Sequence, residues 1–318
     1  MKRTRGAALL AAMLTVTLVA TFAAAALWQQ WRSVEVEGAE RQRIQSAWLL
    51  TGALDWARLI LREDRPAADH FGEPWAVPLQ EARLTTFLAA DANNNMDVGD
   101  ADNVFLSGSI TDLQSRMNIT SLIAAGSVRE SRAESLRRLF EVLGLPQSQL
   151  ARMVPNLRFA LDISTDNLNA ARAPLPPTRV EQLAWLGLAP ETVAALEPYV
   201  TVLPLSATPV NLNTARAEVI YAIGRGFSLA DAQRLVAERE RQHFRTFADV
   251  RPLLPEGASF PDGGVSFNTQ FFEVRGRLRV ENVVIEERSM VQRIGRDIVT
   301  LQRERGGFET FAGDAGRR

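Results

Sequence analysis

The chain has 318 residues, of which 46% are hydrophobic and 23% are charged, enough for one or two domains with cores of their own. The 36 basic and 37 acidic residues leave a net charge of −1, so no global charge excess favours a nucleic acid or an anionic membrane surface as partner. Cysteine is absent and the only histidines are His70 and His243, which excludes disulfides, thiol nucleophiles and zinc sites built from Cys or several His.

The N-terminus combines a short basic segment with a long apolar one. Three cationic residues precede Gly6, and the 22 residues at 7–28 carry no charge. At about 1.5 Å per residue this stretch is long enough to cross a hydrocarbon core of roughly 30 Å. The basic residues are then predicted to lie in the cytoplasm and the rest of the chain beyond the membrane. A secretory signal peptide cut within 23–26 is the alternative.

The apolar helix is predicted to continue as an amphipathic helix over 29–65, since apolar residues recur at helical spacing and no proline precedes Pro66. A basic leader that ends in glycine and runs into such a helix resembles the type IV pilin and pseudopilin class. The resemblance implies that a prepilin peptidase cuts between Gly6 and Ala7 and that the new amino group of Ala7 is methylated. The class normally has Glu as its fifth mature residue, where this chain has Ala11.

Strand-like sequences flank a central helical block. Residues rich in β-branched and aromatic types predict strands at 83–90, 103–110, 271–280, 282–294 and 297–304. Strands before and after helices predict an α/β (α+β) fold, in which one antiparallel sheet carries an inserted all-α domain. The predicted segments are a leader at 1–6, a transmembrane helix at 7–28, its amphipathic continuation at 29–65, the first part of a pilin-like domain at 66–118, the inserted domain at 119–265, closing strands at 266–304 and a flexible tail at 305–318.

The helical block repeats one plan at 136–154, 180–200 and 217–240. Each unit is a helix, a capping glycine (Gly144, Gly187 or Gly224), a short turn and a second helix, and Ser228 is the predicted N-cap of the last one. We therefore predict a helix-hairpin-helix-like (SAM-like) domain. Such hairpins can present amides to phosphate, so a membrane-anchored DNA-binding or DNA-uptake protein is the alternative function. Acidic residues offset the arginines of this block, which favours a packing module that binds no nucleic acid.

Five segments resemble, in order, the minor pseudopilin K family of type II secretion systems. They are WAVPL (75–79), ITDLQSRMNITSL (110–122), LEPYVTVLP (196–204), VNLNTARAEVI (210–220) and RQHFRTFADV (241–250). The second is similar to the family signature I-x-D-x-Q-G-R-F-N-x-N-x-L, of which Asp112, Gln114, Arg116 and Asn118 are kept. We interpret these four as a hydrogen-bonded turn that joins the sheet to the inserted domain, with no catalytic role. The resemblance also accounts for Ala11, because this family lacks the fifth-position glutamate.

The resemblance implies a single-pass protein of the inner membrane with most of the chain in the periplasm. Such a protein caps the tip of the pseudopilus with the minor pseudopilins I and J, and helps to initiate or control assembly. Pseudopilin H and the major pseudopilin are further implied partners, and the prepilin peptidase is the implied processing enzyme. The chain is predicted not to be an enzyme, since G-x-S-x-G, H-E-x-x-H, Walker A and G-x-G-x-x-G motifs are absent from its sequence.

The family also implies bound calcium, which takes oxygen ligands. The segment DANNNMDVGDAD, at 91–102, spaces its candidates like an EF-hand loop, although Met96 stands where the sharp turn needs Gly. The candidate ligands are Asp91, Asn93, Asn95, Asp97 and Asp102. A solvated hairpin loop is the alternative. A second candidate, with Asp162 and Asp166, resembles a reduced form of the family's D-W-x-D-x-D segment.

Overall fold

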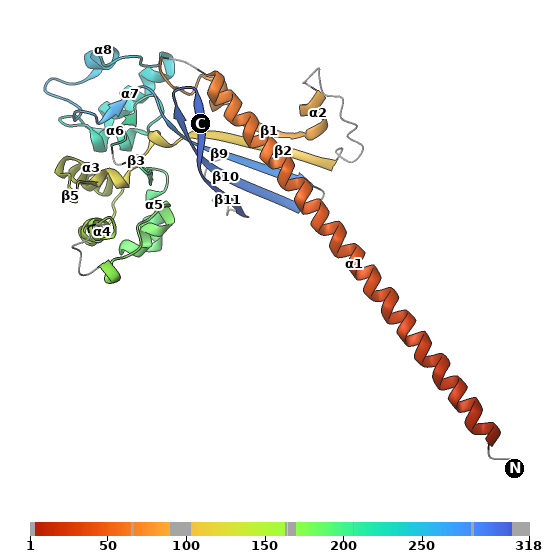
Figure 1. Cartoon of the computed structure of the whole chain (residues 1–318). Helices are drawn as coiled ribbons and strands as arrows, with labels where there is room; N and C mark the ends of the chain where they lie inside the picture. Colours follow the sequence, from red (N-terminus) through yellow and green to blue (C-terminus); the bar gives the residue numbers. More distant parts are fainter. Residues whose placement is uncertain are drawn as a thin grey trace.

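The computed structural model describes residues 4–64, 67–89, 103–162, 164, 170–205, 207–280 and 283–306. Two parts are visible in Figure 1. One is a long helix that lies across a five-stranded sheet, and the other is a helical domain at one end of that sheet. The N-terminal half of the long helix projects away from the sheet and from the helical domain.

The long helix α1 (Thr4–Glu63) runs for 60 residues without interruption, as the sequence predicts. Among the described residues it is the one helix whose length and apolar composition suffice to cross a membrane. Every described side chain from Gln29 to Gln45 is exposed, and Ser46 is the first buried one. The helix therefore has a free half and a half that packs on the sheet.

The sheet is antiparallel throughout, in the order β1-β2-β9-β10-β11. Its strands are β1 (Leu79–Arg83), β2 (Val104–Asp112), β9 (Phe271–Val280), β10 (Val283–Ile294) and β11 (Asp297–Gly306). Neighbouring strands β2 and β9 are separated in sequence by the whole helical block. The expectation of a sheet interrupted by an insertion is therefore confirmed.

Two sequence predictions about the strands are wrong. The predicted strand at 83–90 is the helix α2 (Leu84–Ala89), and the strand that pairs with β2 lies just before it. Leu84 packs among Leu50, Leu106 and other core residues, and this contact overrides the strand propensity of the two threonines that follow it. The strand β11 also extends to Gly306, so 305–306 belong to the sheet and not to the predicted tail.

Apolar side chains of α1 and of the sheet pack together and hold the helix in place. Leu50, Leu54 and Leu61 of α1 are at most 2% exposed. They face alternate residues of β9, including Phe272, Val274 and Leu278, which form the matching buried row of the strand. Between those residues lies Gly276, where an added Cβ would come within 2.8 Å of Leu50 Cδ1. A larger residue would push α1 away from the strand.

The inserted domain is built from short helices and two-residue strands. Its helices are η3 (Leu113–Ser115), η4 (Ile119–Leu122), α3 (Glu130–Val142), α4 (Gln147–Ala160), η5 (Ala170–Arg172), η6 (Val180–Leu186), α5 (Pro190–Leu196), α6 (Ala217–Ile223), α7 (Leu229–Arg241), α8 (Phe247–Val250) and η7 (Arg251–Leu253). Its strands are β3 (Met117–Asn118), β4 (Ile123–Ala124), β5 (Ser127–Val128), β6 (Val200–Thr201), β7 (Val210–Asn211) and β8 (Val265–Ser266). The remaining short helix, η1 (Pro74–Ala76), precedes β1.

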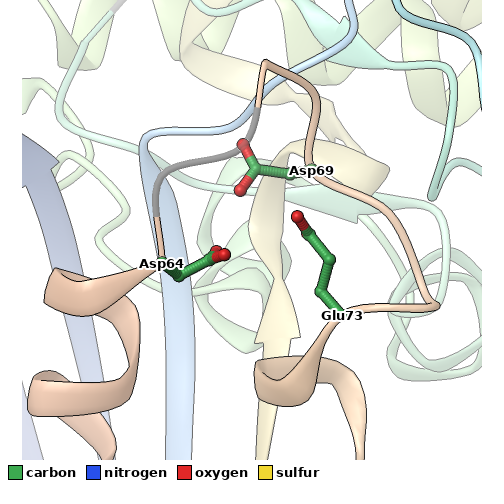
Figure 2. A group of neighbouring side chains, drawn as sticks. All are labelled: Asp64, Asp69 and Glu73. Atoms are coloured by element: carbon green, nitrogen blue, oxygen red, sulfur yellow. The ribbon is translucent and has the colours of Figure 1, made fainter.

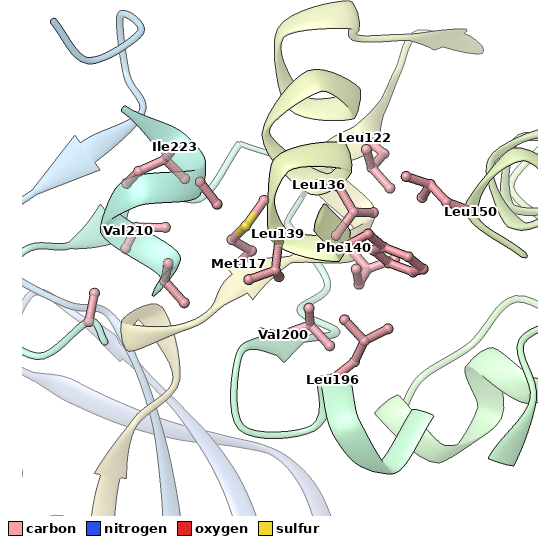
Figure 3. Packing of buried hydrophobic residues seen from close by; sticks show 14 of the residues in the cluster. Met117, Leu122, Leu136, Leu139, Phe140, Leu150, Leu196, Val200, Val210 and Ile223 are labelled. Atoms are coloured by element: carbon pink, nitrogen blue, oxygen red, sulfur yellow. The ribbon is translucent and has the colours of Figure 1, made fainter. Parts of the chain in front are cut away.

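One hydrophobic core unites the inserted domain (Figure 3). Leu139 and Phe140 of α3 lie at its centre and are fully buried. Residues from every helical unit reach this core, among them Leu150 of α4, Leu196 of α5 and Ile223 of α6. The repeated units thus form a single domain, because none of them has an apolar core of its own.

The three hairpins differ in their glycines. Gly144 and Gly187 have positive φ angles of 66° and 100°, as capping glycines do. Gly224 is the C-cap of α6, as predicted, but its φ is −77° and the left-handed residue of this hairpin is Gly226. A Cβ on Gly224 would overlap the ring of Phe227, at 1.8 Å. Gly224 is therefore required for close packing and not for a left-handed turn.

Candidate functional site

Buried polar side chains gather at the junction between the sheet and the inserted domain. Asp112, the last residue of β2, is 1% exposed. Its carboxylate accepts hydrogen bonds from the Gln114 backbone N–H at 2.6 Å, from Asn211 Nδ2 at 2.9 Å and from Thr214 Oγ1 at 2.5 Å. Burial raises the pKa of Asp112, and these hydrogen bonds partly oppose that shift. Asp112 thus ties the end of the sheet to the inserted domain.

The other residues of the signature extend this connection. Gln114 donates from Nε2 to the Pro209 carbonyl at 3.0 Å and accepts at Oε1 from the Gln270 backbone N–H at 2.7 Å. Asn118 accepts at Oδ1 from the Leu203 N–H at 3.0 Å and donates to the Leu205 carbonyl at 2.7 Å. Their side chains therefore bind backbone groups distant in sequence.

The fourth signature residue, Arg116, has a different position. It lines a groove between the inserted domain and the sheet, together with Glu197, Glu273 and Arg275. Asp112, Gln114 and Asn118 thus form a hydrogen-bonded junction, and Arg116 lies in the groove beside it.

Sequence reasoning missed the second half of this junction. Asp69, in the loop after α1, is 1% exposed and accepts at Oδ2 from the Thr269 N–H at 2.7 Å. Its backbone carbonyl accepts from Asn211 Nδ2 at 3.1 Å, and its N–H donates to the Phe267 carbonyl at 2.9 Å. Its carboxylate also pairs with Arg293 of β10. The loop after α1, the inserted domain and the sheet meet at this residue.

Three carboxylates, those of Asp64, Asp69 and Glu73, converge in the loop after α1 (Figure 2). Their oxygen atoms lie within 4.8 Å of one another. Burial, followed by the charge of Glu73, raises the pKa of Asp64 to about 6. Arg293 forms ion pairs with Asp69 and with Asp64, at 3.5 Å in the second pair.

Calcium does not fit this cluster. Glu73 Oε2 already accepts from Trp75 Nε1 at 2.6 Å and from the His70 N–H at 2.9 Å, and Asp69 accepts from Thr269. Arg293 supplies the positive charge that a metal ion would bring. The cluster therefore serves as an arginine-centred contact that closes the loop after α1 onto β10.

The predicted calcium ligands lie mostly outside the described residues. This holds for all five candidates of the 91–102 segment and for Asp166. Asp162 is described, is exposed, and accepts at Oδ1 from the Ser164 N–H at 3.1 Å. Hydrogen bonds from Ser164 lower its pKa.

The hairpin between α6 and α7 is poorly suited to bind phosphate. Ser228 is the N-cap of α7, as predicted, and accepts from the Asp231 N–H. The Asp231 carboxylate accepts in return from the Ser228 N–H at 2.8 Å. This capping box occupies two amides at the start of α7, and it places a negative charge at the same point.

Comparison with known proteins agrees with this architecture. Two family models, both described as type II secretion system protein K, match residues 115–205 and 210–265, which lie in the inserted domain. A protein K of Pseudomonas aeruginosa is 26% identical over 98% of this chain and 93% of its own length. A protein K of Dickeya chrysanthemi is 25% identical over 97% of this chain and 99% of its own. Over nearly its whole length, the chain is similar to protein K of type II secretion systems.

The family resemblance extends to the fold. A chain of the GspK-GspI-GspJ complex from the enterotoxigenic Escherichia coli type 2 secretion system aligns with a TM-score of 0.59. The alignment covers 84% of this chain and 98% of that one at 16% identity. The sheet with an inserted helical domain is therefore a fold that this chain shares with that one.

Proposed function

We propose that this chain is a minor pseudopilin that assembles with the I and J minor pseudopilins at the tip of the pseudopilus and helps to start or control its assembly. The observation that carries this proposal is the uncovered apolar face of α1. Ile44, Trp48, Trp56 and Leu59 are 41–72% exposed on the half of the helix that follows the apolar segment. An apolar face of this kind fits a second helix that rises beside α1 from the same membrane.

The relatives support the choice of partners. Protein K relatives span nearly the whole chain, and the structural relative was solved in a complex with GspI and GspJ. The inserted domain supports the tip position, because a bulky domain at one end of the sheet is easier to place at the end of a fibre than along its shaft. Pseudopilin H and the major pseudopilin follow as further proposed partners.

The proposed role is assembly and not catalysis. In the junction, Asp112, Asp69 and Glu73 each accept hydrogen bonds from donors that hold the fold together. The α6–α7 hairpin carries its own capping carboxylate, which would repel a phosphate. We therefore expect the full chain to show no salt-dependent binding to duplex DNA above background.

The proposal also covers processing and location. The apolar first half of α1 would anchor the chain in the inner membrane, with the sheet and the inserted domain in the periplasm. Prepilin peptidase would cut after Gly6, and Ala7 would become the methylated N-terminus. Mass spectrometry of the protein purified from its membrane tests this point: a mature N-terminus at Ala7 supports the proposal, and one near residue 26 would identify a signal peptide instead.

Co-purification tests the assembly role directly. The full chain is co-expressed with the I and J pseudopilins of the same organism, and the complex is isolated in detergent. The variant Trp48→Asp/Trp56→Asp should lose at least tenfold in recovered partner, because two charges would enter an apolar helix contact. The control Trp185→Asp changes a tryptophan that is 50% exposed on η6, away from α1, and should recover partners like the wild type. Equal recovery for both variants would contradict the proposal.

We also propose that calcium binds within 91–102, on the ligand spacing alone. Calcium titration of the full chain should show a binding event that Asp91→Ala/Asp102→Ala removes. A Glu240→Ala variant on α7 is the matched control for the loss of surface charge. Unchanged calcium binding in the double variant would assign the ion elsewhere.

A further inference from the structure

An apolar groove of about 260 Å³ lies beside α1. One wall is formed by residues of α1 between Ala53 and Ile60, and the other by the segment 74–79, which leads into β1. The floor consists of residues 106–110 of β2 and 274–276 of β9. The groove therefore lies where the helix, the sheet and the chain entering β1 meet.

Two glycines keep the floor of the groove low. Gly108 of β2 and Gly276 of β9 lie directly opposite each other in the sheet, so both positions are on the face that α1 covers. A Cβ on Gly276 would meet Leu50 Cδ1 at 2.8 Å, and a Cβ on Gly108 would meet the Arg275 carbonyl oxygen at 2.8 Å. Because neither residue has a side chain, the groove reaches down to the backbone of the sheet.

The size and the chemistry of the groove indicate what it can hold. Of the described residues that line it, only Arg275 is charged, and its side chain pairs with Glu273 on the other face of the sheet. The volume exceeds the roughly 150 Å³ of a cavity that holds benzene, but it is below the roughly 300–1,000 Å³ of small-molecule pockets. The groove therefore suits a bulky apolar side chain better than a cofactor.

The rim of the groove is continuous with the uncovered apolar face of α1. Trp56 and Val77 stand on opposite walls and are 42% and 68% exposed. On the helix, Leu49, Trp56 and Ile60 are seven and four residues apart, so they form one apolar stripe along the groove. Trp56 also belongs, with Trp48, to the face proposed above to meet a second helix. One partner can therefore cover that face and reach the groove.

The opposite side of α1 is polar and makes contacts within the chain. Arg58 donates from Nη2 to the Ile298 carbonyl of β11 at 2.7 Å and pairs with Asp55 at 3.0 Å. Thr51 Oγ1 accepts from Arg305 Nη2 at 3.3 Å. Helical spacing places Thr51, Asp55 and Arg58 together on this side. An apolar helix that packs on α1 would leave these polar groups in water only if it lies on the groove side.

We propose that the groove is the docking site for the N-terminal helix of a neighbouring minor pseudopilin, which lies on the β2 side of α1 and inserts a bulky apolar side chain beside Trp56. The inference rests on the proposed function and adds the side of α1 and the contact. Side chains three and four residues apart share one face of a helix. A helix that covers Trp48 and Trp56 therefore has a further side chain in position to enter the groove.

Filling the groove from within tests the insertion. The full chain is co-expressed with the I and J pseudopilins and isolated in detergent. Ala53→Phe adds a phenyl group to the wall of the groove and should lower the recovered partner by roughly tenfold or more, because the ring takes the place of the inserted side chain. The control Ala47→Phe makes the same change four residues before Thr51, on the other side of α1, and should recover partner like the wild type.

The outcomes separate this inference from the proposed function. Wild-type recovery with Ala53→Phe would overturn the insertion. If Trp48→Asp/Trp56→Asp then still loses the partner, the assembly role stands and only the groove fails. Wild-type recovery in both variants would contradict the groove and the assembly role together.

Photo-crosslinking in the intact complex tests the side of α1 without filling the groove. A photoreactive residue replaces either Val77 at the rim or Val299 on β11, both of which are exposed valines. We expect position 77 to crosslink to a peptide from the N-terminal helix of I or J, identified by mass spectrometry, and position 299 to crosslink to neither. Equal crosslinking from the two positions, or crosslinking from 299 alone, would overturn the side assigned to the partner. A crosslink from position 77 to the globular part of a partner, or to a second copy of this chain, would overturn the helix as occupant.

Discussion

Two contacts hold this molecule together, one made by apolar side chains and the other by polar side chains. The contact between α1 and the sheet is a row of leucines, Leu50, Leu54 and Leu61, on the apolar face of β9. The junction between the sheet and the inserted domain is a group of buried polar side chains centred on Asp112 and Asp69. The first is closed by apolar burial and the second by hydrogen bonds.

The difference has a physical meaning. Apolar burial has no preferred direction. The leucine row therefore holds α1 on the sheet but tolerates small shifts of the helix along the sheet. Hydrogen bonds are directional and costly to leave unmade, so the junction fixes one orientation of the inserted domain. A polar junction therefore suits a place where two domains must meet at a defined angle.

The largest expected effect is at the junction. Asp112→Ala removes the acceptor shared by Asn211, Thr214 and the Gln114 N–H, and leaves these donors buried without partners. We expect a loss of about 3–5 kcal/mol in the free energy of unfolding. Denaturant unfolding of the full chain in detergent measures it. The control Asp112→Asn keeps one acceptor oxygen and should lose clearly less free energy of unfolding. A loss below about 1 kcal/mol for Asp112→Ala would show that these hydrogen bonds do not stabilise the junction.

The matching change in the other contact is Leu54→Ala. Leu54 is 2% exposed between α1 and β9, so its truncation should cost about 2–4 kcal/mol. The control is Leu49→Ala, at a leucine of the same helix that is 37% exposed, which should cost less than about 1 kcal/mol. Equal losses for the two leucines would mean that α1 does not pack on the sheet through this row.

Two glycine substitutions also test how α1 packs on the sheet. Gly276→Ala places a methyl group 2.8 Å from Leu50 Cδ1 and should destabilise the α1 contact by about 1–2 kcal/mol. Gly52→Ala adds a methyl group to the same helix with nothing within 4 Å, and should stabilise by about 0.5–1 kcal/mol. Thermal unfolding of the two variants should therefore move in opposite directions, and a shift in the same direction would contradict the packing described.

A further test of the junction is its pH dependence. The pKa of Asp64 is raised to about 6, so the folded form holds this proton more tightly than the unfolded form. Its favourable contribution is present at low pH and is lost as the pH rises through about 6. Asp64→Asn should therefore melt higher than the wild type at pH 7.5, and the difference should vanish below pH 4. A difference that is constant between pH 4 and 7.5 would show that Asp64 does not titrate in this range.

The sequence predicted the apolar contact better than the polar one. The single long helix and the strands β9, β10 and β11 follow from apolar periodicity, because one face of each must be buried. The strand predicted at 83–90 failed because the burial of Leu84 decided the local structure against propensity. Such failures arise where one tertiary contact outweighs a weak local preference.

Only part of the polar junction could be predicted from the sequence. Asp112, Gln114 and Asn118 were singled out by a family signature, but Asp69, Thr269 and Arg293 were not. The bond from Thr269 to Asp69 joins residues 200 positions apart, and that from Asn211 to Asp112 joins residues 99 apart. Long-range hydrogen bonds leave no periodic trace in a sequence, so neither the partners nor the acidic cluster beside Arg293 could be predicted.

The free half of α1 determines the distance between the apolar first half of the helix and the globular part of the chain. With residues 7–28 in a bilayer, the exposed turns from Gln29 to Gln45 hold the sheet and the inserted domain about 20–25 Å beyond the lipid, at about 1.5 Å per residue. That gap is about two helix diameters wide. In the assembly proposed above, the globular part of a neighbouring subunit would fit into this gap from the side, and the length of the bare helix would then limit how closely two subunits can pack.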